Sequence, residues 1–410
     1  IDFEFINVKM QQADFIICLL FFTLICTRGE SIKMDITRAR KKNPLGIIKF
    51  IKKNVMMLIA VLAALISAFF VKPDSAYLDY FDFKTLTCLF CVLAVVCAFK
   101  NIAFFELLAA QIVKNCKNIR ITVLVLVYIT FFGSMLITND TALLTFLPLA
   151  YTTLKRTGKE KYTAFTFIMQ NMAANLGGMI TPFGSPQNLF LYSKYAIPNG
   201  KFFSIMLPPF LLSLVLITIC CVFIKPDPIS IGGEPEKTDR KKAVIYGILF
   251  AFSVALVFRA VPYYIGLPVV IAALFFLDRK ALAAVDYPLL MTFAAIFVFS
   301  GNLSRIETVK VFFSSLLGKN TLICAALSSQ VISNVPAAIL LSNFTTDYAG
   351  LLVGVNVGGV GTIIASLASL ITLREYASLY PEKQERYFAE FSAYNFGFLA
   401  ILLIFCSFIL

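Results

Sequence analysis

The sequence predicts an all-α polytopic membrane protein, an inverted-topology repeat with two re-entrant hairpins and two broken transmembrane helices. Composition is the first reason, since 59% of the 410 residues are apolar, 14% are charged and the mean hydropathy is +0.85. Soluble domains have about 45–50% apolar and about 25% charged residues, so a water-soluble globule is excluded. The second reason is a series of apolar runs separated by basic loops. The third is the same order of parts on both sides of a central polar linker.

The positive charge indicates how the chain sits in a membrane. Lysine and arginine number 36 against 23 acidic residues, a formal net charge of +13. In a soluble protein this excess would suggest nucleic acid as a partner. Here the basic residues lie in short loops between apolar runs, so we expect a lipid bilayer as partner and no nucleic acid. The positive-inside rule gives a multi-pass protein of the cytoplasmic (inner) membrane with a cytoplasmic N-terminus.

Residue types also exclude several functions. The chain has no histidine, which removes Ser-His-Asp triads and every His-ligated metal site. Cys88 and Cys91 form a single C-x-x-C inside an apolar run, without the second pair that a metal site needs. The sequence therefore predicts no cysteine metal centre. Asp140 and Asp347 could be proposed as the aspartyl pair of an intramembrane enzyme, but nothing in their sequence contexts matches one, so no enzyme is predicted.

Residues 1–54 form an N-terminal segment that we expect to be cytoplasmic and partly dispensable. The chain opens with Ile1, and its first apolar run, residues 15–26, is too short to cross a bilayer, which takes about 20 residues. We expect the functional chain to begin near Met34, with residues 1–33 dispensable.

Residues 55–224 form the first predicted transmembrane repeat. It should begin with two spans, at residues 55–71 and 85–99, and an interfacial stretch at residues 101–113. A hairpin at residues 121–154, a broken span at residues 162–191 and a final span at residues 202–224 should follow. The hairpin is flanked by Lys and Arg at both ends, so both ends are cytoplasmic. Either two full spans place Thr138, Asn139 and Asp140 outside, or a re-entrant hairpin places them at membrane depth. The second arm is only about 14 residues long, which favours the hairpin.

A polar linker at residues 225–242 separates this repeat from the second, residues 243–410. The second repeat should begin with three spans, at residues 243–261, 265–277 and 287–301, and an amphipathic stretch at residues 303–317. A hairpin at residues 321–344 and a broken span at residues 348–373 should follow. A charged loop at residues 374–390 and a last span that ends at residue 410 complete it. The hairpin is split by Ser333, Asn334 and Pro336. Arg305 and Glu307 in the amphipathic stretch are expected to be solvated charges.

The two halves match at their polar interruptions. Residues 137–139 (ITN) correspond to 332–334 (ISN), and residues 175–178 (NLGG) to 356–359 (NVGG). Seven Lys or Arg flank the first hairpin, whereas only Lys310 and Lys319 flank the second. The first hairpin should therefore enter from the cytoplasm and the second from outside, which defines an inverted repeat of the kind that secondary transporters use.

The interruptions locate the predicted site. Non-helical backbone is tolerated at membrane depth only where it is buried in protein or lines a cavity. Half-helices that begin at such breaks point their positive N-terminal ends inward and suit an anion. Freed carbonyl groups, with Asn, Thr and Ser oxygens, suit a small hard cation such as Na⁺.

At these residues the chain resembles the ion transporter superfamily, specifically the citrate-transporter-like and divalent anion:sodium symporter group. The resemblance lies in residues 136–148 (LITNDTALLTFLP), 175–188 (NLGGMITPFGSPQN), 333–341 (SNVPAAILL) and 356–370 (NVGGVGTIIASLASL). It implies an elevator-type secondary transporter, a homodimer, that couples a small anionic substrate to Na⁺ or H⁺ and needs no other cofactor.

The resemblance also implies site residues. One cation, with Na⁺ beside Asn139, would be bound by Thr138, Asn139, Gly177 and Gly178. We add Asp140 to this site because an ionisable group inside a membrane is costly and usually functional. The other, beside Asn334, would be bound by Ser333, Asn334, Asn356 and Gly358. The substrate would contact Thr138, Asn139, Asp140, Thr141, Ser185, Pro186, Asn188, Ser333, Asn334 and Thr362.

Asp140 departs from the pattern, because dicarboxylate symporters have Thr at this position. A carboxylate there would repel a di- or trianion unless a proton or cation neutralised it. Asp after Asn is more like the arsenite-efflux and Na⁺/H⁺ antiporter branches, whereas residues 184–188 (GSPQN) are more like the dicarboxylate branch. Asp140 could also serve only as the N-cap of a helix that begins at Thr141.

The leading prediction is a secondary transporter of a di- or tricarboxylate coupled to Na⁺ or H⁺. The alternative is arsenite efflux or Na⁺/H⁺ antiport that uses Asp140. A passive channel would not need two distinct cation sites. An ATP-driven pump would need a phosphate-binding G-x-x-x-x-G-K-[ST] loop, which the sequence lacks.

Overall fold

The computed structural model describes residues 54–229 and 239–410, and the predicted start near Met34 lies outside them. Over the described residues the chain is all helical, with one isolated β-bridge between Asn118 and Pro228 in place of a sheet. The predicted all-α fold class is confirmed.

The first half follows the predicted order of parts. Its helices are α3 (Val55–Phe70), η1 (Ser75–Tyr80), α4 (Phe83–Asn101), α5 (Phe104–Val113), α6 (Ile119–Gly133), α7 (Asn139–Arg156), η2 (Glu160–Tyr162), α8 (Thr163–Gly177), η3 (Gly178–Ile180), α9 (Pro186–Lys194) and α10 (Asn199–Val222). Helix α8 ends at Gly177, where a stretch rich in glycine and proline begins (residues 177–186). This end is expected, because proline lacks the amide hydrogen that a continuous helix needs.

The second half begins with more helices than the first, and its later parts then follow in the same order. Its helices are α11 (Arg240–Val257), α12 (Tyr263–Leu277), α13 (Arg279–Ala284), α14 (Tyr287–Ser304), α15 (Glu307–Lys319), α16 (Thr321–Ile332), α17 (Asn334–Leu341), α18 (Tyr348–Val357), η4 (Ile363–Ala365), α19 (Leu367–Leu379), η5 (Pro381–Lys383) and α20 (Gln384–Ile409). The pair α16–α17 corresponds to α6–α7, and the broken helix α18–α19 corresponds to α8–α9.

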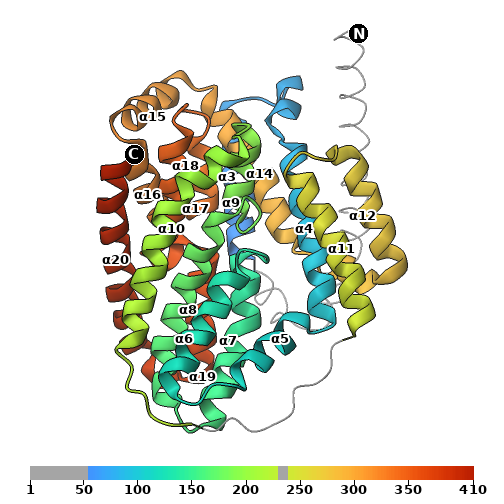
Figure 1. Cartoon of the computed structure of the whole chain (residues 1–410). Helices are drawn as coiled ribbons and strands as arrows, with labels where there is room; N and C mark the ends of the chain where they lie inside the picture. The colour runs from blue at the N-terminus through green and yellow to red at the C-terminus, as the bar shows by residue number, and fades with distance from the viewer. Residues whose placement is uncertain (1–53, 230–238) are drawn as a thin grey trace, which may run out of the picture.

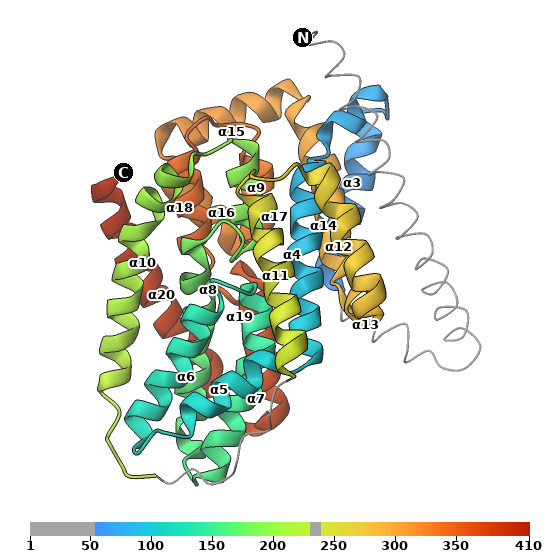
Figure 2. The same ribbon diagram turned by 45° about the vertical axis from the view of Figure 1, so that its right-hand side comes forward.

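The corresponding parts lie at opposite ends of the molecule. Figure 1 shows α5, α6 and α7 in its lower half and α15, α16 and α17 in its upper half. The broken helix α8–α9 leads from the lower half to the upper, and α18–α19 leads from the upper to the lower (Figures 1 and 2). This arrangement is compatible with an inverted repeat, which stays a prediction.

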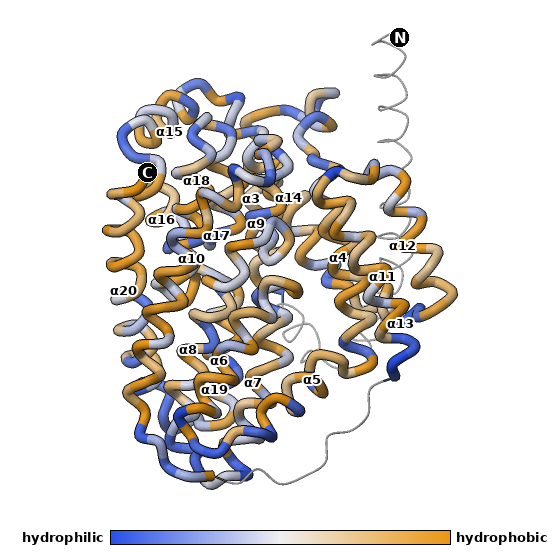
Figure 3. Tube along the Cα trace, in the orientation of Figure 1, coloured by the Kyte–Doolittle hydropathy of each residue, from blue (hydrophilic) through white to orange (hydrophobic). Residues whose placement is uncertain are grey.

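Apolar side chains both fill the interior and cover the outside. Figure 3 shows a predominantly hydrophobic middle zone with hydrophilic stretches gathered toward the two ends. Large apolar residues are nearly fully exposed on the outer helices, where Phe69, Phe276 and Phe408 have relative exposures of 85%, 82% and 85%. Exposed apolar surface of this extent marks a surface that contacts lipid.

Several described helices have the dimensions of membrane spans. Four of them are long and apolar enough to cross a bilayer, namely α4, α10, α14 and the η5–α20 segment Pro381–Ile409. Helices α15 and α16, bent by 120° at their junction, form a fifth candidate. Within the described residues α6 and α7 are not among the candidates, and neither are α3 and α12.

Three element boundaries differ from the predictions. The charged loop predicted at 374–390 is mostly helical, because α19 continues to Leu379 and α20 begins at Gln384. Helix α11 begins at Arg240 inside the predicted linker, where the Asp239 carboxylate accepts a hydrogen bond from the Lys242 amide at 3.2 Å. Pro336 does not split the second hairpin, because it lies in the first turn of α17, where its missing amide hydrogen is not needed.

Candidate functional site

The first hairpin turns at residues 134–138. The Ile137 amide donates to the Gly133 carbonyl at 2.9 Å, and the Thr138 and Thr141 hydroxyls lie 2.9 Å apart. Asn139 is the first residue of α7 and is only 5% exposed. Its amide nitrogen donates to Asn175 Oδ1 at 3.2 Å, which joins the turn to α8.

Asp140 does not cap a helix. Helix α7 begins at Asn139, with Thr138 in the N-cap position, so the carboxylate lies in the first turn. Its Oδ1 is buried without a hydrogen-bond partner among the described residues. The capping interpretation is therefore wrong, because the helix starts before the predicted position and the side chain accepts no backbone hydrogen bond.

The first gap separates α8 from α9. The break leaves backbone carbonyl oxygens without a helical partner, and one side chain pairs with several of them. Asn188 Nδ2 lies within hydrogen-bonding distance of the carbonyl oxygens of Gly178, Met179 and Thr181, at 3.4, 3.0 and 3.2 Å. The Thr181 hydroxyl donates to the Met135 carbonyl at 2.9 Å and ties the gap to the hairpin turn.

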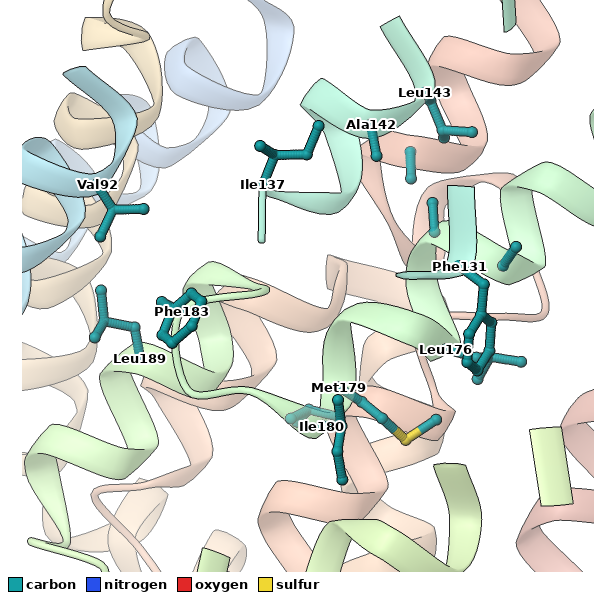
Figure 4. Packing of buried hydrophobic residues seen from close by; sticks show 14 of the residues in the cluster. Val92, Phe131, Ile137, Ala142, Leu143, Leu176, Met179, Ile180, Phe183 and Leu189 are labelled. Carbon is teal, nitrogen blue, oxygen red and sulfur yellow. The ribbon is translucent and has the colours of Figure 1, made fainter. Parts of the chain in front are cut away.

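The paired glycines of this gap allow close backbone contact. A Cβ at Gly177 would overlap the Phe131 carbonyl oxygen of α6. A Cβ at Gly178 would lie 2.9 Å from the Gly184 carbonyl oxygen and 3.2 Å from that of Ser134. Apolar residues of the same region, such as Leu176 and Phe183, belong to the hydrophobic core (Figure 4).

The second hairpin turns at a single residue, Ser333, whose φ of +72° lies in the left-handed region. Its hydroxyl donates to the Ala365 carbonyl at 3.3 Å. Asn334 begins α17 and is 3% exposed. Asn334 Oδ1 accepts from the amide of Val335 at 2.9 Å.

Gln330, which the sequence analysis did not select, organises the second gap. Its Nε2 donates to the carbonyl oxygens of Ala326, Gly358 and Val360 at 3.1, 2.8 and 3.1 Å. Its Oε1 accepts from the Thr362 amide at 2.7 Å, and the Thr362 hydroxyl donates to the Gln330 carbonyl at 2.9 Å. An amide inside an apolar run next to the turn was the signal available in the sequence.

Side-chain amides join the two halves at the gaps. Asn356 Nδ2 donates to Asn188 Oδ1 at 2.5 Å, and Gln187 Nε2 donates to Asn356 Oδ1 at 3.3 Å. A Cβ built at Gly359 would lie 3.0 Å from Asn334 Nδ2 and 3.7 Å from Asn175 Oδ1. Residues from both hairpin turns and both gaps therefore meet at one buried centre.

Three helices begin at this centre without a side-chain cap. Thr138, Ser185 and Ser333 occupy the N-cap positions of α7, α9 and α17, yet none of them accepts a capping hydrogen bond. Elsewhere the chain uses carboxylate and amide caps, as at Asp82 on α4 and Asn118 on α6. Pro186 of α9 and Pro336 of α17 lack an amide hydrogen, and the Val335 amide of α17 donates to Asn334 Oδ1. The capacity to bind a ligand therefore lies with the other first-turn amides, above all those of α7.

The predicted site residues fall into three groups. Asn139, Asn188, Asn334 and Asn356 are joined to the centre by the contacts above. Gly358 and Thr362 are bonded to Gln330. The remaining members, namely Thr138, Asp140, Thr141, Ser185, Pro186, Gly177, Gly178 and Ser333, lie in the two turns and in the first gap.

Comparison with known proteins gives a consistent assignment. The family model for the citrate transporter matches residues 45–356. An uncharacterized transporter of Methanocaldococcus jannaschii is 34% identical over 72% of this chain and 81% of the relative. An inner membrane protein of Escherichia coli is 32% identical over 66% of this chain and 74% of the relative. An uncharacterized transporter of Mycobacterium tuberculosis is 25% identical over 71% of this chain and 75% of the relative.

These matches agree with the sequence resemblance and with the helical, lipid-facing fold. The family and the relatives named as transporters are not enzymes, in line with the sequence prediction. The protein is a multi-pass membrane transporter and belongs to the citrate transporter family.

Proposed function

We propose that the protein is a secondary active transporter that moves a small anion, a di- or tricarboxylate, across the cytoplasmic membrane with Na⁺ or H⁺ as the coupling ion. The observation that carries the proposal is the meeting of three uncapped helix starts, α7, α9 and α17, at one buried centre. Unpaired backbone amides with the positive end of a helix dipole favour negatively charged ligands.

Coupling to a cation is supported by oxygen atoms in the first hairpin turn and in the first gap. Asn139 Oδ1, Asp140 Oδ1 and Ser185 Oγ are buried without hydrogen-bond partners among the described residues. Buried polar atoms are normally satisfied, so such atoms indicate a missing ligand. Amide, carboxylate and hydroxyl oxygens form a donor set that fits Na⁺, and a carboxylate also accepts a proton.

Movement between two access states is part of the proposal. We expect the centre to move as a unit, since the hydrogen bonds among Gln187, Asn188 and Asn356 hold α9 and α18 together. This fits an elevator-type transporter, and the predicted homodimer would supply a fixed surface for the motion.

Uptake into proteoliposomes tests the proposal. Radiolabelled succinate or citrate should accumulate when an inward Na⁺ or proton gradient is imposed, and collapse of that gradient by an ionophore should abolish the accumulation. Accumulation of neither substrate, or uptake that ignores both gradients, would contradict the proposal.

A second candidate function is arsenite efflux or Na⁺/H⁺ antiport, which the Asp140 carboxylate favours, since its Oδ1 is buried without a hydrogen-bond partner among the described residues. A charged group at this depth is costly and is usually functional. The same vesicles decide between the candidates, because antiport would appear as Na⁺-driven proton movement without any carboxylate. Arsenite efflux would appear as arsenite movement that carboxylates do not compete with.

A further inference from the structure

A cavity of about 480 Å³ lies between the ends of four helices. It is lined by η1 and the first turn of α4, the last turn of α9, the last two turns of α14 and the end of α17. These helices pack against one another, α4 with α9, α9 with α17 and α17 with α14. Because α14 leads directly into α15, the cavity lies toward the upper end of the molecule in Figure 1. Its volume is typical of small-molecule sites, which have about 300–1,000 Å³.

The cavity reaches from the surface toward the buried centre. At one side it is lined by Asp79, which is exposed, and at the other by Phe190 and Ile339, which are buried. Phe190 lies two residues after Asn188 on α9. Ile339 lies five residues after Asn334 on α17, a distance of about 7.5 Å along a helix. The cavity is therefore a separate space about one to two helical turns from the centre.

Two ammonium groups from different helices line the cavity. Lys84 is half-buried in the first turn of α4, and Lys194 is the exposed last residue of α9. Neither forms an ion pair with a carboxylate of the described residues. A partly buried cation normally has an anionic partner, so this pair of lysines indicates a missing one.

The position of Lys84 is not explained by its own helix. The positive end of the helix dipole disfavours a cation in the first turn. The neighbouring Asp82 carboxylate is already used as the N-cap, because it accepts from the Thr85 amide at 2.9 Å and from the Thr85 hydroxyl at 2.5 Å. Asp79, the other lining carboxylate, is exposed on η1, where water weakens its repulsion of an anion.

The second lysine is held in place by a neutral side chain. Lys194 Nζ donates to Asn343 Oδ1, and Asn343 Nδ2 donates to Ser300 Oγ of α14 at 2.7 Å. An ammonium group has three hydrogens to donate, so two remain for a ligand. The cavity thus combines one ammonium group on α4 with a positioned one on α9.

We propose that this cavity is an anion-binding site separate from the buried centre, in which Lys84 and Lys194 bind a small anion with two negative charges. A dicarboxylate fits this class, with one carboxylate group for each ammonium group. The choice of a dicarboxylate rests on the proposed function. The site collects the anion at the surface and raises its concentration next to the centre.

Equilibrium dialysis of radiolabelled succinate, and in parallel citrate, against the purified full chain counts the sites without a gradient. The wild type should bind two anions per chain, one at the centre and one in the cavity. Lys84→Gln and Lys194→Gln should each weaken one binding step at least about tenfold, the effect of a lost charge-assisted hydrogen bond. The other step should stay within about twofold of the wild type.

The variants are designed to separate charge from structure. Glutamine at position 194 keeps a hydrogen-bond donor for Asn343, and Lys84→Arg and Lys194→Arg keep the charge, so both arginine variants should retain two steps. Lys201→Gln is the matched control, because Lys201 is an exposed lysine at the start of α10 and does not line the cavity. It should bind two anions with the affinity of the wild type.

Several results would overturn the cavity site. They are a single bound anion in the wild type, two steps that neither glutamine variant weakens, and an equal loss in Lys201→Gln, which would show a general effect of surface charge. If one glutamine variant does not fold, the other variant and the wild-type stoichiometry decide the test.

Uptake into proteoliposomes separates this inference from the proposed function. One bound anion together with gradient-driven uptake would overturn the cavity site and leave the proposed transport standing. Two bound anions without gradient-driven uptake would overturn the proposed transport and leave the cavity site standing. Binding of neither succinate nor citrate would overturn both.

Discussion

At the scale of single residues, the centre of the molecule is built from amide side chains. Asn188 and Gln330 satisfy the carbonyls that the two gaps release. Asn356 joins the halves through Asn188 and Gln187. An amide offers a donor and an acceptor without a charge, so it can replace lost backbone hydrogen bonds at a lower desolvation cost than a carboxylate.

Asp140→Asn should uncouple transport. The substitution keeps the size of the side chain and removes its negative charge, so a cation loses about 2 kcal/mol of binding, or about thirtyfold in affinity. Gradient-driven accumulation should fall accordingly, whereas downhill exchange should persist. Uptake by the variant into proteoliposomes, measured with and without the gradient, checks this.

Asp347→Asn is the control for that experiment. Asp347 Oδ1 caps α18 by accepting from the Gly350 amide at 2.9 Å, and asparagine is an equally good cap. Coupling in this variant should equal that of the wild type. Full gradient dependence in Asp140→Asn would refute a coupling role for that carboxylate.

Gly359→Ala should disturb the packing of the second gap against the second hairpin turn. The added methyl group would lie 3.0 Å from Asn334 Nδ2 and 3.1 Å from the Asn356 carbonyl oxygen, so the Asn334 side chain must shift. We expect a destabilisation of about 1–3 kcal/mol, as for overpacked interiors, and a higher KM for the substrate. Denaturation of the purified protein and uptake kinetics measure the two effects.

Gly397→Ala is the matched control, because nothing lies within 4 Å of a Cβ at this position of α20. Alanine favours a helix over glycine by about 0.5–1 kcal/mol, so this variant should be at least as stable as the wild type. Equal behaviour of the two alanine variants would show that the close approach at Gly359 has no energetic role.

At the scale of elements, the sequence predicted the helices well where polar interruptions or caps mark their ends. The breaks after α8 and α18 and the turn at Ser333 lie where Gly, Pro and Asn interrupt apolar runs. The charged stretch after Leu379 was misjudged as a loop. Charge does not prevent helix formation, and α20 extends beyond the apolar zone through charged residues such as Arg386 and Glu390, which pair at 2.8 Å.

An ion pair between elements also escaped the sequence analysis. Arg305, expected to be solvated, forms two hydrogen bonds with the Asp74 carboxylate at 3.0 and 2.7 Å and one with the Tyr80 hydroxyl at 3.1 Å. The Arg305 side chain therefore links the C-terminal end of α14 to the loop that follows α3. The hydrogen bonds from Arg305 lower the pKa of Asp74 from its ordinary value of 3.8.

This pair predicts a pH-dependent contribution to stability. Because the pKa of Asp74 is depressed in the folded protein, the contribution is present above the ordinary value of 3.8 and is lost as pH falls through the folded value. Arg305→Gln should therefore lower the melting temperature slightly at pH 7. At a pH below the pKa of Asp74 in the folded protein, the variant and the wild type should have the same melting temperature. The effect should be small and should shrink with added salt, because the pair is exposed. A pH-independent difference would contradict this origin.

At the scale of the whole molecule, orientation in the membrane is the main prediction. Figure 1 places the start of α11 and helix α15 toward opposite ends of the molecule. The excess of basic residues around the first hairpin predicts that the lower end in that view faces the cytoplasm. Lys242, at the start of α11, should then be cytoplasmic, and Lys319, at the end of α15, should be outside.

Accessibility of introduced cysteines tests this orientation. Lys242→Cys and Lys319→Cys are made in a background without native cysteines, because both positions are exposed. An impermeant maleimide added to intact cells should label only the Lys319 position, and permeabilised cells should show both. Labelling of the Lys242 position in intact cells would reverse the topology.

The sequence by itself determined the membrane setting, the all-helical class and the positions of the hairpin turns and gaps. These depend on local signals, namely apolar run length, basic flanks and Gly, Pro and Asn punctuation. Only the tertiary structure decided which polar atoms find partners. Hydrogen bonds such as those from Gln330 to Gly358 and from Asn356 to Asn188 join residues far apart in the chain. No local pattern records them, because they depend on how packing brings distant backbone and side-chain groups into hydrogen-bonding distance.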